Sequence, residues 1–361
     1  MADTTIATAN RVKQWDSNFF KSYVRANRFK KYMGTSTNAI IQVIENLTKQ
    51  KGDAITVPLV GALDDSAGAN DGSSDLVGNE KALPNDGHQI TVAVVRDAVV
   101  VNMEEEQASP VDIRNAGKDA LKTLAMRYLR TAITNALHSI DGVNYGSATE
   151  GNKDTWLTNN SDRVLFGADI GNQVGGDHSA SLLTVDATND KLNKALVSKI
   201  RRMAQEADTA NSDGIRPHSY GEDEETFILF VGSRAFRDLK ADMNTVLTDA
   251  EKRGKSNPLF RGGIDLYWDG VVVREIKEIP VLAGVGAAAA DVEPMFLCGA
   301  QAIGVAWAKR TKTTLRKEDD YGFKHGVGFF EMRGVEKIQY GTSTPIDWGV
   351  VTGYVAAAAD A

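Results

Sequence analysis

The chain has 361 residues, 42% hydrophobic and 25% charged, which is typical of a soluble globular protein. Its length indicates two or three packed units, or one domain with large excursions. Its 41 Lys and Arg against 48 Asp and Glu give a net charge of −7, which argues against a surface that clamps nucleic acid throughout. The single cysteine, Cys298, excludes a disulfide framework and a cysteine-cluster metal site. With no signal-peptide pattern and no apolar run near the ~18 residues that span a bilayer, we expect cytoplasmic synthesis and no membrane partner.

The N-terminal segment concentrates basic and aromatic side chains. Residues 11–31 carry seven positive charges against the single acid Asp16. Six aromatic residues are interleaved up to Tyr32. Two interpretations stay open: an extended arm, or an amphipathic helix that packs on its own domain.

A long β-hairpin is predicted next. Residues 54–60 (AITVPLV) indicate an edge or irregular strand, because Pro58 cannot donate to a strand ladder. Residues 89–102 (QITVAVVRDAVVVN) are rich in β-branched side chains and indicate a second strand, whereas the 28 residues of 61–88 are polar and lack an apolar period. Because a two-stranded ribbon is marginal alone in water, we expect it to lie on a partner subunit.

The clearest element is a helix over Ser109–Asp141, with Ser109 as N-cap, Pro110 at the first helical position and Gly142 just beyond its end. Its apolar residues recur close to the 3.6-residue period. At ~1.5 Å per residue such a helix is roughly 46 Å long, an elongated spine. Residues 143–189 are polar and rich in Gly and Asn, which predicts a second loop excursion.

The remaining chain alternates between helices and strands. Strands on both sides of the helical blocks indicate the α+β class. The predicted elements are helices at 191–208 and 233–250, a buried strand at 226–231, a hairpin at 266–276 that turns at Asp269-Gly270, strands at 295–309 and 326–340, and a loose tail at 355–361.

No group of residues predicts catalysis, cofactor binding or metal binding. The run Gly284–Ala289 matches G-x-G-x-x-A, but no helix fits after it and no acidic residue stands about 20 positions on, so a loop over a sheet edge is favoured. His178, His218 and His325 lack partners at metal-ligand spacing.

Three charged groups remain. The doublet Asp64-Asp65 and the triplet Glu104–Glu106 are interpreted as solvated acids rather than cation ligands. The basic segment 309–312, followed by Arg316 and Lys317, could contact phosphate or the acids of another subunit. Because Asp319 and Asp320 follow closely, pairing between subunits is favoured.

This order of parts resembles the major capsid protein of tailed bacteriophages with the Hong Kong 97-type fold. The specific likeness lies in the C-terminal third, in the runs NPLFRGGIDLYWDGVVVREIKEIPVLAG, MFLCGAQAIGVAWAKR, EDDYGFKHGVGFFEMRGVEKIQYG and DWGVV. It covers residues 10–355 and is firm after about residue 225. The resemblance implies an N-terminal arm (1–52), an extended β-hairpin loop (53–104), a peripheral domain with spine helix and polar insertion (105–189), an axial domain (190–300), and a peripheral return with the C-terminal tail (301–361).

The resemblance also implies the function. Hexamers and pentamers of the chain would close an icosahedral shell around double-stranded DNA without sequence-specific contacts, with scaffolding, portal and cement proteins as candidate partners. The chain would be a non-enzymatic component of the virion, made in the bacterial cytoplasm, with no cofactor. An encapsulin-like cargo shell and, less favoured, a soluble α/β enzyme are the alternatives.

Some members of this fold join lysine to asparagine between subunits. Because Lys81 is the only lysine between Asp53 and Lys118, we predict no such crosslink here.

Overall fold

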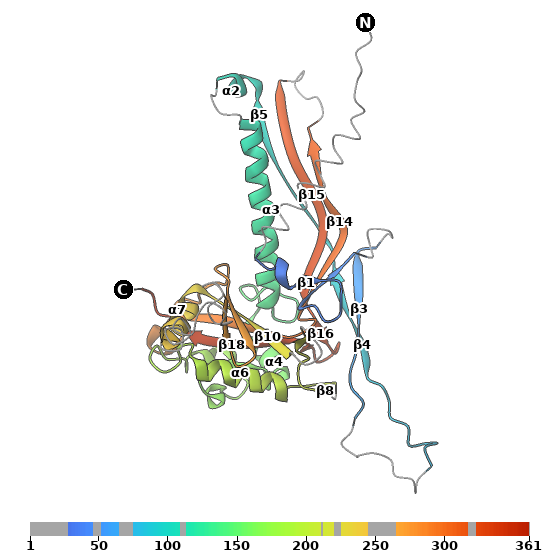
Figure 1. Ribbon diagram of the computed structural model, residues 1–361, viewed down its shortest axis with the longest axis vertical. Coiled ribbons are helices and arrows are strands. Elements are labelled where there is room, and N and C mark those ends of the chain that lie inside the picture. Colours follow the sequence, from blue (N-terminus) through green and yellow to red (C-terminus); the bar gives the residue numbers. More distant parts are fainter. Residues whose placement is uncertain are drawn as a thin grey trace, which may run out of the picture.

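A computed structural model describes residues 28–45, 52–64, 75–108, 113–210, 212–219, 225–244, 265–316 and 323–360. A rod made of a long helix and long strands rises from a compact lobe, and a hairpin extends from the junction in the opposite direction (Figure 1). The predicted cap at Ser109 and Pro110 and most of the N-terminal segment lie outside the described residues. Among the described residues, none of the helices combines the length and apolarity needed to cross a membrane.

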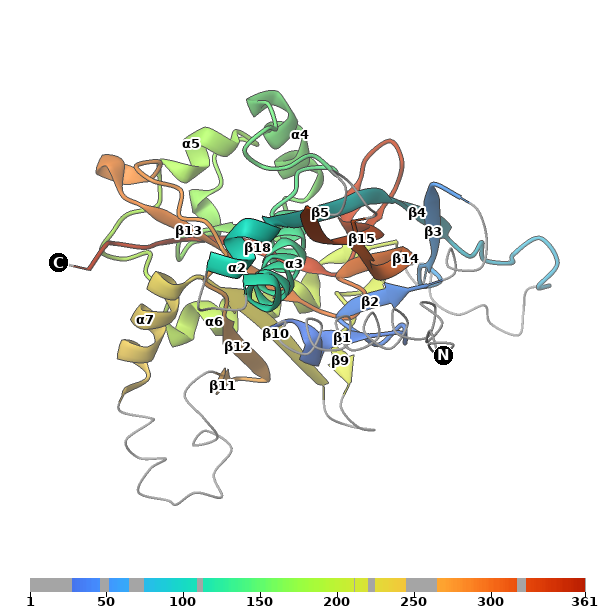
Figure 2. The same ribbon diagram turned by 90° about the horizontal axis from the view of Figure 1, so that it is seen from above.

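The rod is a five-stranded sheet with a helix on one face. Its strands lie in the order β1-β2-β14-β15-β5, and α3 is seen end-on beside them in Figure 2. Every fourth residue of α3 from Leu121 to Leu137 is buried, and this stripe packs against Trp307 and Phe329 of the sheet. The bounds are α3 (Ile113–Leu137), β1 (Met33–Gly34), β2 (Ile41–Ile44), β5 (Ala93–Asn102), β14 (Ile303–Leu315) and β15 (Lys324–Lys337).

The lobe is a seven-stranded sheet, ordered β11-β12-β10-β13-β18-β6 with β9 paired to β10. Alternate residues of β10 pack on its two faces: Leu229 lies in the core with α6 and α7, and Phe230 lies in the core shared with α3. The bounds are β6 (Val164–Phe166), β9 (His218–Ser219), β10 (Glu225–Val231), β11 (Asp265–Trp268), β12 (Val271–Glu275), β13 (Val292–Cys298), β18 (Val350–Ala356), α6 (Lys194–Glu206) and α7 (Ser233–Asp242).

Two predicted elements are confirmed in detail. β3 spans Ala54–Val60, and the Asp269-Gly270 turn has φ values of 47° and 71°, as a type I′ hairpin requires. In the described part of the N-terminal segment, Phe29 and Tyr32 lie with ring centroids 5.2 and 5.5 Å from that of Phe230, so this stretch, including the 3-10 turn η1 (Lys30–Tyr32), packs on its own domain.

Several predicted strands are divided between sheets. The predicted strand 295–309 is β13 in the lobe followed by β14 in the rod, and the predicted strand 89–102 is divided at Val92 between β4 (Asn85–Thr91) and β5. The strand 326–340 ends at Lys337, after which β16 (Gln339–Tyr340) pairs with β17 (Ile346–Asp347). A continuous apolar pattern does not reveal where a chain changes sheets, because both sheets bury it equally.

The spine helix ends earlier than predicted, at Leu137 rather than Asp141. Its 25 described residues span about 37 Å. Gly142 does not end the helix but forms, with Asp141, a two-residue turn between Ile140 and Val143, whose backbones exchange hydrogen bonds of 2.8 Å.

The prediction of a loop over 143–189 is wrong. Trp156, Leu157 and Phe166 are buried with Tyr354 in a core of their own. The Asn-, Asp- and Gly-rich pattern of this insertion reflects turns and helix caps, since Asp177 accepts a hydrogen bond from the Ala180 amide at 2.8 Å. Its elements are α4 (Glu150–Asn159), β6, the 3-10 turn η3 (Ile170–Asn172) and α5 (His178–Leu182).

The tail is not loose as predicted. Val355 and Ala356 complete β18, where they pair with β13 and are fully buried. Ala357 is buried too, and its amide donates to the Asp291 carbonyl at 2.8 Å while its carbonyl accepts from Arg234 at 3.0 Å. Alanine suits position 357 because its backbone lies against the Asp291 backbone, which leaves little room for a larger side chain.

The hairpin β3–β4 is anchored through one face. Ile55, Val57 and Leu59 are buried and pack with Ile90 and Ile338. Where the hairpin crosses β15, a side chain at Gly334 would overlap the Thr91 carbonyl oxygen.

A buried ion pair joins the lobe, the rod and the insertion. Lys337 Nζ donates to Asp347 Oδ2 at 2.7 Å and to the carbonyl of Ser139, just past the end of α3, at 2.8 Å. Trp156 Nε1 of α4 donates to the same carboxylate at 3.2 Å, and Arg163 donates to the Asp347 carbonyl at 2.7 Å. Because both charged side chains are 1% exposed, these hydrogen bonds are needed to offset the loss of water.

We expect Asp347→Asn to lower the free energy of unfolding by about 3 kcal/mol, because Lys337 would lose its nearest counter-ion inside the protein. Urea denaturation of the unassembled subunit measures this loss. The control is Lys337→Met combined with Asp347→Asn, which removes both charges and should lose less. A double variant as unstable as the single one would contradict this view of the pair.

We expect Gly334→Ala to cost about 1–3 kcal/mol, since the added methyl group meets backbone rather than a movable side chain. Gly146→Ala is the matched control, because a side chain there meets nothing within 4 Å. Thermal unfolding compares the two variants, and equal melting temperatures would show that the hairpin does not press on β15 at this point.

Candidate assembly surface

The outward face of the hairpin is exposed in the part of the chain that the structure describes. Thr56, Pro58 and Val60 alternate with the buried residues of β3 and point away from the core. Among the described residues β3 and β4 pair only with one another, so each presents an open outer edge. This ribbon is therefore held by the rest of the described chain through one face only.

The tip of the hairpin exposes apolar side chains beside acidic ones. Leu76 and Val77 are 66% and 86% exposed, and Leu63 and Leu83 are about half exposed. Asp75 and Glu80 lie in the same described stretch. Exposed apolar groups of this kind, rimmed by polar residues, are typical of a contact surface.

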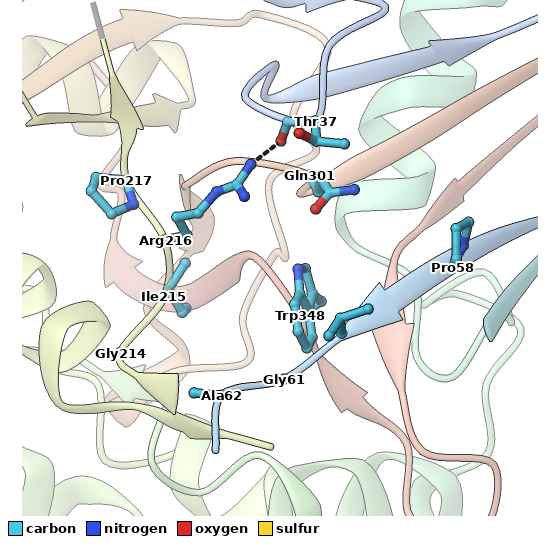
Figure 3. A pocket seen from close by; sticks show the side chains of 11 residues that line it. Thr37, Pro58, Gly61, Ala62, Gly214, Ile215, Arg216, Pro217, Gln301 and Trp348 are labelled. Carbon is cyan, nitrogen blue, oxygen red and sulfur yellow. Dashed lines mark hydrogen bonds between the residues drawn. The ribbon is translucent and has the colours of Figure 1, made fainter. Parts of the chain in front are cut away.

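A cavity of about 550 Å³ lies between the base of the hairpin and the lobe (Figure 3). Pro58, Gly61 and Ala62 of the hairpin side face Ile215 and Trp348 across it. At one end the Arg216 guanidinium donates to the Thr37 carbonyl. The cavity is lined by five segments far apart in sequence, none of which supplies a nucleophile paired with a base.

The predicted basic segment lies on the outer half of β14. Lys309, Arg310, Lys312 and Arg316 are exposed, whereas Thr311 and Thr313 between them are buried. Arg310 pairs with Glu45 within the chain, so part of this charge is already balanced. Of the predicted acidic groups, Glu104 and Glu105 are exposed on α2 (Met103–Ala108), Asp64 is exposed, and Asp65 lies outside the described residues.

Strongly perturbed titratable groups lie in the core, away from the cavity of Figure 3. Burial lowers the pKa of His138 to about 3, and its ring stacks on Tyr145 with centroids 3.9 Å apart. Burial likewise raises the pKa of Tyr354 and of the Cys298 thiol. Because these groups are buried and cannot contact a ligand, their shifted pKa values are explained by packing in the core rather than by catalysis.

The three histidines and the glycine-rich run considered in the sequence lie in different parts of the fold and do not form one site. His218 Nδ1 lies 2.6 Å from the Asn38 carbonyl, His325 lies on β15, and His178 is buried in the insertion. The run Gly284–Ala289 ends in one 3-10 turn, η5 (Ala287–Ala289), inside a loop closed by the bridge between Leu282 and Val292, which confirms the loop prediction. Sequence patterns did not reveal the cavity, because its walls meet only in the folded chain.

The chain matches known phage coats over its whole length. A family model described as phage capsid protein matches residues 3–359. The major capsid protein of Pseudomonas phage KPP25 is 28% identical over 369 residues, which cover 95% of this chain and 94% of that relative. The capsid asymmetric unit of cyanophage Pam1 superposes with a TM-score of 0.80 at 33% identity, with 100% of both chains covered.

The capsid of Ralstonia phage GP4 shares the fold, with a TM-score of 0.72 at 19% identity over 93% of this chain and 92% of that chain. The predicted Hong Kong 97-type α+β fold is thereby confirmed. This chain belongs to the phage capsid protein family.

Proposed function

We propose that this phage major capsid protein closes an icosahedral shell from hexamers and pentamers around double-stranded DNA. The observation that carries the proposal is the hairpin β3–β4, with open edges and an exposed apolar tip that a single subunit leaves in water. A neighbouring subunit that lies under the ribbon would pair or cover these edges and bury the tip. Repeated head-to-tail contacts of this kind close into rings, and small changes of angle allow two ring sizes.

The five-part division of the chain is part of the same proposal. In it the arm (1–52) and the extended hairpin (53–104) reach over neighbours, and the axial domain (190–300) lies where subunits of one ring meet. The acidic residues of the hairpin, such as Asp75 and Glu80, and the exposed lysines of β14 have opposite charge, which favours pairing between subunits.

The net charge of −7 supports enclosure of DNA without a grip on each phosphate. We further propose synthesis in the bacterial cytoplasm, assembly with scaffolding, portal and cement proteins, and no enzymatic activity. An encapsulin-like cargo shell is not favoured, because the family model and the relatives named above are those of phage capsids. A purified chain that stays a monomer under all conditions, including with a scaffolding partner, would refute the proposal.

We expect Val77→Asp to block shell formation while the subunit still folds, because this side chain is 86% exposed and has no intrachain core to lose. Electron microscopy and sedimentation measure assembly, and circular dichroism measures folding. Val77→Ile is the matched control and should assemble normally. Shells of Val77→Asp that form in normal yield would remove the tip from the contact surface.

We expect mature particles to dissociate into monomers on a denaturing gel, because Lys81 is the only lysine in the hairpin segment and one candidate is poor support for a covalent network. Ladders of dimers and larger species that survive boiling in detergent would contradict this expectation.

A further inference from the structure

Three carboxylates meet between α4 and α5 in the insertion. Glu150 and Asp154 lie one turn apart on α4, and Asp177 precedes α5. One oxygen from each lies within 4.8 Å of the others. Three carboxylates at this spacing repel one another, so the arrangement needs a compensating positive charge.

The hydrogen bonds that Asp154 and Asp177 accept within the insertion involve only one carboxylate oxygen of each residue. Asp154 Oδ1 accepts a hydrogen bond from the His178 amide at 2.8 Å, and Asp177 Oδ1 accepts from Ser179 Oγ at 2.9 Å. For Oδ2 of each residue, no hydrogen bond is found within the described chain. Capping therefore fixes the two carboxylates in place and accounts for half of their oxygens.

A buried imidazole points at the same cluster. The side chain of His178 is 0% exposed, and its Nδ1 lies 3.9 Å from Glu150 Oε1 with no hydrogen-bond partner among the described residues. An unpaired buried polar atom is costly, so its position calls for a partner. Nε2 lies 3.3 Å from the Tyr354 hydroxyl. With the proton on Nε2, donated to that hydroxyl, the Nδ1 lone pair faces the carboxylates.

The charges around the site favour a divalent ion. Lys153 Nζ lies 3.4 Å from Glu150 Oε2 and 4.5 Å from the centroid of the Tyr145 ring. One lysine against three carboxylates leaves a charge of −2.

We propose that Glu150, Asp154, Asp177 and His178 Nδ1 bind one divalent transition-metal ion of the Mn²⁺ or Zn²⁺ type. Three carboxylate oxygens with one imidazole nitrogen suit these ions, whereas Ca²⁺ and Mg²⁺ prefer oxygen ligands alone. The ion would tie α4 to α5 and stabilise the insertion in proportion to its affinity. The site does not depend on shell formation, since all four ligands come from one chain.

Manganese alone is the probe. Full-length protein, freed of metal with EDTA, is titrated with MnCl₂ while electron paramagnetic resonance records the free ion. We expect one Mn²⁺ per chain, binding about tenfold or more weaker in Glu150→Gln, and a higher melting temperature with the ion bound. Glu150 is 45% exposed, so this variant should fold. Glu206→Gln, an exposed glutamate at the end of α6, is the control and should bind as the parent does.

The histidine is tested without altering it, because a substitution at a buried position could unfold the insertion. Electron spin-echo spectra of Mn²⁺ bound to the parent protein should show coupling to one imidazole nitrogen. The proposal is overturned if Mn²⁺ does not bind, if Glu150→Gln binds equally well, or if the bound ion shows no nitrogen coupling.

Discussion

The ion pair between Lys337 and Asp347 is the point at which the separate parts of the subunit meet. Around it lie the chain just past α3, the indole of Trp156 in α4 and the guanidinium of Arg163. The Ser139 carbonyl and the Trp156 indole contact charged groups that are 1% exposed, and Arg163 donates to the backbone carbonyl of Asp347. Because a buried charge tolerates few alternative arrangements, the pair constrains how the rod, the lobe and the insertion sit together.

From this rigid junction the chain extends in two directions. The rod buries its apolar stripe within the subunit, whereas the hairpin buries only the face that carries Ile55, Val57 and Leu59. Its other face is exposed and its outer edges are open, and in the proposed function a neighbour covers them. The exposed face of the hairpin is therefore surface suited to contacts with other copies.

Local patterns predicted the elements whose cause is local. The four-residue repeat in α3, the Asp269-Gly270 turn and the strand ended by Val60 follow from short-range rules. The change of sheet between β13 and β14 and the buried tail at Ala357 depend on contacts between distant segments, as do the cavity by Trp348 and the carboxylates around His178. The helices and the strand of the insertion were not predicted, because Asn, Asp and Gly occur in helix caps and tight turns as well as in long loops.

The central claim is that neighbouring subunits complete the hairpin. Amide hydrogen exchange of residues 54–60 and 85–91, compared between unassembled subunits and purified shells, tests it most directly, with residues 225–231 of the buried strand β10 as the internal reference. We expect the hairpin amides to exchange about tenfold or more slowly in the shell, while those of β10 stay unchanged. Equal exchange of the hairpin in both states would contradict the claim.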